Sequence, residues 1–230
     1  MIDHVHDLNA VREATDRLLS AVGTLDNAAV AGPSRLPGWS RGHVLAHLAR
    51  NADALVNVLE GRPMYASAEA RDADIERDAA RPAATHLADL RESAARFRRT
   101  TDAPADWGRT VTLRNGVTDS AARVPFRRLI EVELHHVDLG IGYEPADLPA
   151  EFTAREIAFL AERFTGHPDV PALRLEAADG GAWRTGRAEG EPLTVTGTAP
   201  ALMCWLAGRR DDTAPAPEAG GAPLPVLPPL

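Results

Sequence analysis

Four segments in the first 142 residues repeat apolar side chains at the spacing of an α-helix. Within each segment, this spacing gathers the apolar residues on one helix face. Because the connections between the segments are short or of modest length, we expect the helices to pack antiparallel, as in a four-helix bundle. The expected helices cover residues 8–22, 41–60, 83–100 and 125–142.

Residues at the segment ends predict where these helices begin. Asp7 is the candidate N-cap of the first helix, and Ser40 is the candidate N-cap of the second. A polar, alanine-rich stretch separates the second helix from the third. Between the third and the fourth, Asn115 and Gly116 form a strong turn signal, so we expect a short hairpin over 110–117.

After Pro149 the helical pattern gives way to a mixed one. Thr153 and Glu156 match a capping box, which predicts that a helix opens there. Short apolar runs bounded by glycine-rich turns follow, and such runs are typical of strands in a small sheet. The expected elements are a helix over 153–164, strands over 172–177 and 193–198, and a short helix over 200–206.

These patterns together predict an α+β protein of two domains. Residues 1–148 are expected to form the helical bundle, and residues 149–212 a small α+β domain. The remaining residues, 213–230, make a tail rich in proline, alanine and glycine, which we expect to be extended or poorly ordered. Its last part, 224–230, is nevertheless apolar enough to dock on the domain.

Composition excludes several classes of protein. The single cysteine, Cys204, cannot form an internal disulfide, so nothing points to an oxidising compartment. A net charge of -8 argues against a general nucleic-acid or anionic-membrane binder. We see no signal-peptide pattern and no run near the roughly 20 apolar residues that cross a bilayer. We therefore expect a cytoplasmic protein. Its 25 basic residues are all arginine, the better bidentate partner for carboxylates.

His47, Glu131 and His135 are the residues that point most directly to chemistry. His47 lies on the second expected helix, in line with its apolar stripe. Glu131 and His135 lie on the fourth, where positions four apart share a face. Two imidazoles and a carboxylate suit a borderline divalent metal such as zinc, and three protein ligands leave a coordination position open, as in catalytic sites.

Each of these residues also has a plainer interpretation. A lone inward histidine such as His47 is more often a hydrogen-bonded core residue than a ligand. Glu131 and His135 match an ordinary surface pair, worth a few tenths of a kcal/mol. Glu133 and His136 would be the ligands if the helix phase were different, but the apolar stripe favours Glu131 and His135.

Neighbouring polar residues are weaker candidates. Asp138, three residues after His135, is either an acceptor for that imidazole or a solvent-facing residue. His43, one turn before His47, is either a supporting residue of the site or a surface histidine. Cys204 sits among apolar residues, so a packed core thiol is favoured over a nucleophile. Sequence motifs for nucleotide cofactors and for serine hydrolase chemistry are absent.

Several stretches resemble the mycothiol-dependent maleylpyruvate isomerase family, which belongs to the DinB-like metalloenzymes. The metal motifs are shared by many thiol transferases of that superfamily, and the stretch 63–71 narrows the resemblance to the isomerases. The similarity spans nearly the whole chain. The stretches that carry it are Leu36–Trp39, Val44–Leu48, Asn51–Leu55, Pro63–Arg71, Glu131–Gly140, Ala207–Arg209 and Leu224–Leu230.

The resemblance implies a DinB-like four-helix metal-binding bundle followed by a small α+β domain. It implies zinc held by His47, Glu131 and His135, with catalytic roles for His47, Glu131 and Arg209. Arg210 leaves that last assignment ambiguous, and the plainer reading of both arginines is a favourable charge at a helix C-terminus.

The reaction implied by the resemblance is the cis–trans isomerisation of maleylpyruvate to fumarylpyruvate in gentisate degradation. A zinc-bound thiolate would add to the double bond, allow rotation, and then leave. Because Cys204 looks buried, the external thiol mycothiol would supply the sulfur. The partners would thus be a small dicarboxylate and a low-molecular-weight thiol, with neither nucleic acid nor membrane. The alternatives are a mycothiol S-transferase for other electrophiles and a non-catalytic metal-binding or sensor protein.

Overall fold

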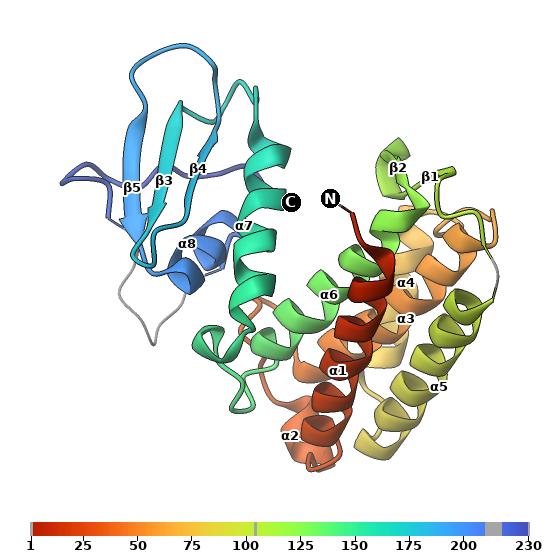
Figure 1. Cartoon of the computed structure of the whole chain (residues 1–230). Coiled ribbons are helices and arrows are strands. Elements are labelled where there is room, and N and C mark those ends of the chain that lie inside the picture. The colour runs from red at the N-terminus through yellow and green to blue at the C-terminus, as the bar shows by residue number, and fades with distance from the viewer. Residues whose placement is uncertain (1, 104, 210–217, 230) are drawn as a thin grey trace. The chain divides into compact units, whose positions relative to one another are not determined.

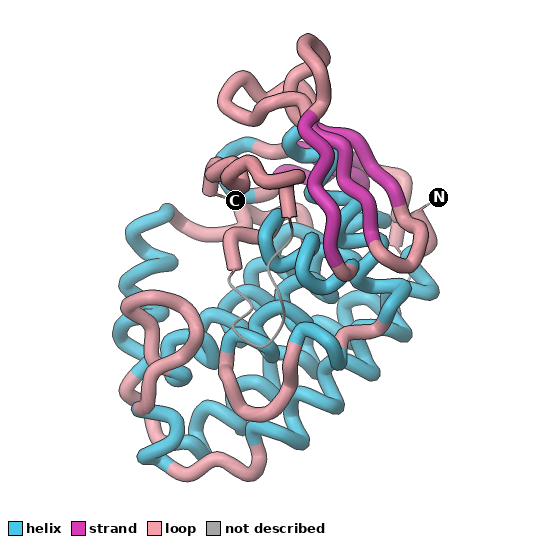
Figure 2. The backbone as a smooth tube through the Cα atoms, turned by 90° about the vertical axis from the view of Figure 1, so that its left-hand side faces the viewer, coloured by secondary structure: helices cyan, strands magenta, loops and turns pink. Residues whose placement is uncertain are grey.

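The structure is a computed structural model that describes residues 2–103, 105–209 and 218–229. The chain divides into two compact units, Met1–Gly142 and Tyr143–Leu230. The first unit is helical apart from one small hairpin, and the second combines helices with a small sheet (Figures 1 and 2). This confirms the predicted α+β class, with a helical region first and a small sheet domain second.

Four long helices of the first unit correspond to the four predicted from the apolar spacing. α1 packs against α6 and α5, and α3 packs against α5, α4 and α6 (Figure 1). The core between them is made of aliphatic side chains, among them Leu18, Leu45, Leu48 and Leu55. The helices of this unit are α1 (His4–Val22), α2 (Asn27–Ala31), α3 (Arg41–Leu59), α4 (Ala68–Ala79), α5 (Ala83–Asp102) and α6 (Val124–Asp138).

The prediction for the start of α1 was wrong by one turn. Asp3, not Asp7, is the N-cap, and its side chain accepts hydrogen bonds from the amides of Val5 and His6. Asp7 is fully buried inside the helix. The added turn carries little apolar periodicity, which is why the sequence pattern began at Leu8.

The polar stretch between the second and third predicted helices contains a helix that the sequence pattern missed. α4 begins after Ser67, whose hydroxyl accepts a hydrogen bond from the amide of Ala70. Its only buried residues are Ile75, Asp78 and Ala79. Such a helix has no apolar stripe that a sequence pattern could detect. It is held to its neighbours by ion pairs, such as the one between Asp78 and Arg50 of α3 at 3.3 Å.

Ser40 is confirmed as the N-cap of α3, where its side chain accepts a hydrogen bond from the amide of His43 at 3.3 Å. A hairpin is present as predicted, but it extends beyond 117, because β1 (Thr110–Thr112) pairs antiparallel with β2 (Thr118–Ser120). Asn115 and Gly116 both take positive φ angles, 58° and 73°, as the turn signal requires.

The second unit packs α7 (Ala150–Phe164) and α8 (Ala199–Leu206) together beside a three-stranded sheet. The sheet order is β4-β3-β5, with β3 antiparallel to β4 and parallel to β5 (Figure 1). Ile157, Leu173 and Leu202 are among its fully buried side chains. The strands are β3 (Leu173–Ala177), β4 (Ala182–Thr185) and β5 (Leu193–Gly197), and β4 carries Trp183.

The capping box predicted at Thr153 and Glu156 was wrong. α7 begins three residues earlier, after Pro149, and Thr153 lies inside it with its hydroxyl donating to the carbonyl of Pro149 at 3.2 Å. The preceding short helix η3 (Pro145–Asp147) packs against α8. The first compact unit therefore ends at Gly142, and η3 belongs to the second unit.

The described part of the C-terminal tail lies on the second unit. Glu218 exchanges backbone hydrogen bonds with Thr196 of β5, both at 2.8 Å. Further along, the indole nitrogen of Trp205 donates to the carbonyl of Pro225 at 3.3 Å. The rest of the predicted tail, 213–217, and residue 230 lie outside the described residues. No helix among the described residues has the length and apolar character needed to span a membrane.

Candidate metal centre

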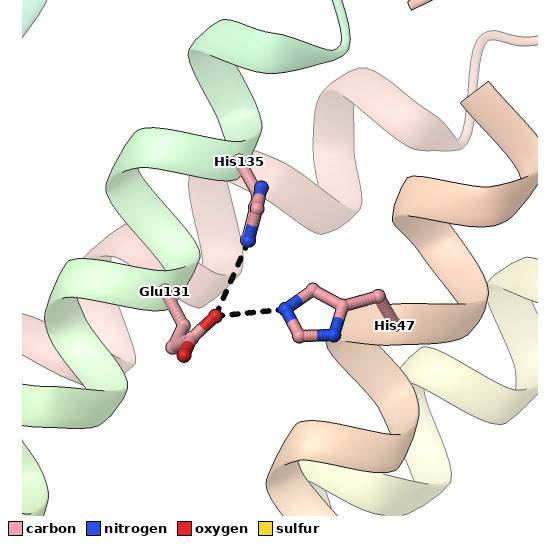
Figure 3. Close-up of side chains that lie close together, drawn as sticks. All are labelled: His47, Glu131 and His135. Atoms are coloured by element: carbon pink, nitrogen blue, oxygen red, sulfur yellow. Dashed lines mark hydrogen bonds and ion pairs between the residues drawn. The ribbon is translucent and has the colours of Figure 1, made fainter. Parts of the chain in front are cut away.

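α3 and α6 bring the three predicted ligands together. One carboxylate oxygen of Glu131 lies 2.9 Å from Nε2 of His47 and 3.3 Å from Nε2 of His135 (Figure 3). One potential ligand atom from each residue lies within 4.8 Å of the others, so the group can hold a metal ion. The arrangement depends on the packing of α3 on α6 and on the four-residue spacing within α6.

The three side chains differ in their access to solvent. His47 and His135 are largely withdrawn, with side chains 7% and 11% exposed, whereas the Glu131 side chain is 31% exposed. The ring of Trp39 lies 5.7 Å from that of His47, measured between centroids. The site therefore has buried imidazoles and a carboxylate that is partly exposed to solvent.

Asp138 supports His135 from behind. Its carboxylate lies 2.8 Å from Nδ1 of His135, and the Asp138 side chain is almost fully buried. Because a carboxylate accepts hydrogen bonds, this contact favours a proton on Nδ1 and orients the ring so that Nε2 faces Glu131. Of the two interpretations considered for Asp138, the structure therefore shows the acceptor.

Arg71, from the first turn of α4, contacts the other imidazole. Its Nη2 lies 3.2 Å from Nδ1 of His47, its Nη1 pairs with Asp72 at 2.6 Å, and its guanidinium lies over the ring of Tyr65. Sequence reasoning missed this residue because α4 itself was missed. The available signal was the stretch Pro63–Arg71, which carried the family resemblance.

The charges of the site reinforce one another. Burial alone would raise the pKa of Glu131, but His47 and His135 hold that pKa well below its ordinary value. Burial lowers the pKa of His47. Burial also acts to lower the pKa of His135, yet hydrogen bonds to Asp138 and Glu131 outweigh it and the pKa is raised. Glu131 is thus a carboxylate at neutral pH, as a metal ligand must be.

Arg128 places a buried cation on the same helix as Glu131. Its Nη1 donates to the carbonyl of Leu48 at 2.9 Å and to the amide oxygen of Asn51 at 2.8 Å. Burial lowers the pKa of Arg128 to about 10, so the guanidinium remains protonated at neutral pH. These bonds tie α6 to α3 one turn away from the ligands and fix the register between the two helices.

The competing pair, Glu133 and His136, lies on another face of α6. Glu133 is buried and pairs with Arg17 of α1 at 2.6 Å, and the charge of Arg17 also acts on the buried His136. Neither residue belongs to the metal-binding group found among the described residues. His43 likewise serves elsewhere, since it completes the cap of α3 and reaches Glu76 at 3.2 Å.

Arg209 belongs to the second unit, where its Nη1 donates to the carbonyl of Ala207 at 3.1 Å. The three ligands belong to the first unit, so the role of Arg209 beside them stays a prediction. Arg210 lies outside the described residues. Cys204 is 2% exposed, which agrees with the packed core thiol expected from its neighbours.

A cavity of about 550 Å³ opens between the α3–α4 connection and the hairpin. Its described lining includes Arg62, Arg109 and Arg114 and contains no Asp or Glu. None of the three ligands lines it, but Tyr65 does, and Arg71 lies over the Tyr65 ring. The cavity is therefore lined by cationic side chains, and one of its lining residues, Tyr65, contacts Arg71, which in turn contacts His47.

Comparison with known proteins places the chain in a family. Residues 11–140 match the family model "Mycothiol maleylpyruvate isomerase N-terminal domain", and residues 147–229 match "MDMPI C-terminal domain". No curated protein sequence matches the chain. The crystal structure of a mycothiol-dependent maleylpyruvate isomerase is similar, with a TM-score of 0.89, 25% identity, and coverage of 99% of this chain and 97% of that chain.

The crystal structure of a histidine-to-alanine mutant of the mycothiol-dependent maleylpyruvate isomerase has the same TM-score and coverage at 24% identity, which by itself shows a common fold. The two family models together cover both units of the chain. The chain therefore belongs to the mycothiol maleylpyruvate isomerase family.

Proposed function

We propose that this protein isomerises maleylpyruvate to fumarylpyruvate with mycothiol as the thiol cofactor and zinc as the metal. The observation that carries the proposal is the group of His47, Glu131 and His135, held by two packed helices in a member of this family. The group suits an enzyme because three protein ligands leave a coordination position open for a reactant.

The residues present fit zinc by the chemistry of their donors. Two imidazoles and one carboxylate are common zinc ligands, and Asp138 orients His135 in the way that outer hydrogen bonds orient metal-binding histidines. Zinc bound there would lower the pKa of a thiol, so that thiolate is available at neutral pH.

The cis double bond of maleylpyruvate is conjugated to a carbonyl group. When a thiolate adds to the alkene carbon, the electron pair moves to the carbonyl oxygen and leaves a carbon–carbon single bond that rotates. Expulsion of the thiolate then restores the double bond in the trans form. Cys204 is buried in the second unit, so an external thiol has to supply the sulfur.

The residues of this chain position the substrate during that rotation. We propose that Arg209 pairs with a substrate carboxylate, because arginine matches carboxylates bidentately and this position carried the family resemblance. The cationic cavity beside Tyr65 offers room for another part of the reactants. His47 and Glu131 retain the catalytic roles assigned from the sequence, through the metal that they would hold.

We further propose that α1, α3, α5 and α6 form a DinB-like antiparallel four-helix bundle, which their pairwise packing supports. The domain organisation of 1–148, 149–212 and a tail at 213–230 remains our proposal in its finer boundaries. A cytoplasmic location is also proposed, supported by the lone cysteine and by the need for a reduced thiol.

The decisive experiment measures loss of maleylpyruvate and formation of fumarylpyruvate by zinc-loaded protein, with and without mycothiol. We expect turnover only with mycothiol, and none with the Glu131→Ala protein. A parallel assay with a generic electrophile tests for a mycothiol S-transferase. Conjugate formation without isomerisation would replace the proposed activity, and tight zinc binding without any turnover would indicate a sensor or binding protein.

A further inference from the structure

The two imidazoles of the candidate metal centre have neighbours of opposite charge. Behind His135 lies the carboxylate of Asp138, which accepts hydrogen bonds. Beside His47 lies the guanidinium of Arg71, with Nη2 at 3.2 Å from Nδ1. A guanidinium carries five donors and no acceptor, so Nδ1 of His47 has to be the acceptor in this contact. The proton of the His47 ring is then on Nε2, where it faces Glu131.

These two tautomers are unequally prepared for a metal ion. The nitrogens that face the centre of the group are both Nε2 (Figure 3). His135 already directs Nδ1–H at Asp138, so a metal ion bound at its Nε2 leaves that hydrogen bond in place. His47 has to lose the proton on Nε2 and gain one on Nδ1, and Nδ1 would then point a hydrogen at Arg71. Two donors cannot share a hydrogen bond, and a dication beside the imidazole also repels the guanidinium.

The surroundings of Arg71 keep the guanidinium close to the centre once that contact is broken. Its Nη1 pairs with Asp72, whose side chain is 64% exposed, and its planar group lies 5.9 Å from the ring centroid of Tyr65. Tyr65 in turn lines the cationic cavity. Arg71 is therefore held by an ion pair on α4 and by the aromatic ring of Tyr65, which lines the cavity.

We propose that metal binding releases Arg71 from His47 and that the released guanidinium binds a carboxylate of the substrate. The substrate part of this inference rests on the proposed isomerase function. The planar fork of arginine suits a carboxylate better than any other side chain does, and release by the metal would make this cation available only in the loaded enzyme.

The first test is the tautomer of His47, read from nitrogen chemical shifts of histidine-labelled protein and assigned with the His47→Asn variant. We expect the Nε2–H tautomer in metal-free protein and the Nδ1–H tautomer after zinc is added, with no change of tautomer at His135. A metal-free His47 that already carries its proton on Nδ1 would overturn the proposal.

The second test is the zinc affinity of Arg71→Met, measured by competition with a chelator. Because the variant lacks the competing donor and the repelling charge, we expect zinc to bind about tenfold more tightly. Arg98→Met, on the exposed face of α5, is the matched control and should bind zinc as the unaltered protein does. Weaker or unchanged affinity in Arg71→Met would mean that Arg71 only supports the fold around His47.

The third test separates substrate binding from zinc binding. Zinc-saturated Arg71→Met should show a KM for maleylpyruvate raised by about tenfold or more, and Arg71→Lys should recover part of it. If unaltered protein isomerises but KM is unchanged in Arg71→Met, the carboxylate contact is wrong. If unaltered protein does not isomerise at all, the proposed function and the substrate contact fail together, while the tautomer and the zinc affinity still decide the release.

Discussion

Two faces of α6 carry the same pair of residue types and do different work. On one face, Glu131 and His135 meet His47 of α3. On the other, Glu133 pairs with Arg17 of α1, and His136 lies within reach of the same charge. The Glu131 side chain is 31% exposed and the Glu133 side chain 1%.

Solvent access and neighbouring side chains, more than residue type, therefore decide what a glutamate and a histidine do. A carboxylate that faces a second imidazole and an open side is placed to share a metal. A carboxylate sealed against an arginine stabilises the contact between two helices instead, because a buried charge is tolerated only when it is paired.

Replacing each glutamate in turn should separate the roles of the two faces of α6. Glu131→Ala should lose zinc binding and reduce isomerase activity by about a thousandfold or more, since several kcal/mol of transition-state stabilisation depend on the metal. Glu133→Ala should keep full zinc content and lose about 1–3 kcal/mol of unfolding free energy. Metal analysis and denaturant unfolding of both proteins give the answer. Equal zinc loss in both would abolish the distinction between the faces.

The buried face of α6, which carries Glu133 and His136, should also affect how the unfolding free energy depends on pH. Burial, with help from Arg17, lowers the pKa of His136 to about 4, below the ordinary 6.5. The unfolded chain therefore takes up a proton as the pH falls from about 6.5 to 4 while the folded protein does not, so up to about 3 kcal/mol of stability, present above pH 6.5, is lost in that window.

His136→Gln should flatten this decline in the unfolding free energy, measured by urea unfolding at a series of pH values. His6→Gln, which changes an exposed histidine of α1, serves as the control. An unchanged slope in His136→Gln would show that this histidine is not held neutral by the fold.

On the open face, Asp138→Asn should weaken zinc binding by about 10- to 100-fold without unfolding the protein. The amide is a poorer acceptor for Nδ1–H of His135 than the carboxylate is, so the ring loses both orientation and basicity. Chelator competition measures the affinity, and the melting temperature checks the fold. Unaltered affinity would remove Asp138 from the description of the site.

The smallest expected effect concerns the partner of the sealed carboxylate. Arg17→Ala should lower the unfolding free energy by about 1–3 kcal/mol, because Glu133 loses an ion-pair partner while it is buried. Arg12→Ala, on the same helix, removes an arginine paired with the half-exposed Asp102 and should cost less than about 1 kcal/mol. Comparable losses in the two variants would show that burial of Glu133 adds nothing.

The face of α6 that carries Glu131 and His135 could be predicted from the sequence, because the spacing of apolar residues indicates both the helix and the direction in which each residue points. Ile130, Leu134 and Val137 set this direction, and it selected Glu131 and His135, the pair that the structure brings to His47. The long helices, the hairpin and the small sheet followed from the same kind of pattern.

The remaining features depend on contacts that leave no such pattern. α4 is held by ion pairs such as Arg50 to Asp78, so its sequence reads as a polar stretch and its Arg71 could not be placed beside His47. Caps are another case, because Asp3 and Asp7 are equally good capping residues and only the fold decides between them. The role of Arg209 depends on how two separate units come together, which spacing cannot encode.

The hydrogen bonds between Glu218 and Thr196 affect the tendency of the protein to aggregate at high concentration. β5 is an outer strand of its sheet, and an uncovered outer strand is a template on which other chains aggregate. The C-terminal segment occupies part of that edge. A protein truncated after Gly208 would keep every proposed metal ligand. It would, however, expose the unpaired backbone groups of β5 and aggregate more readily.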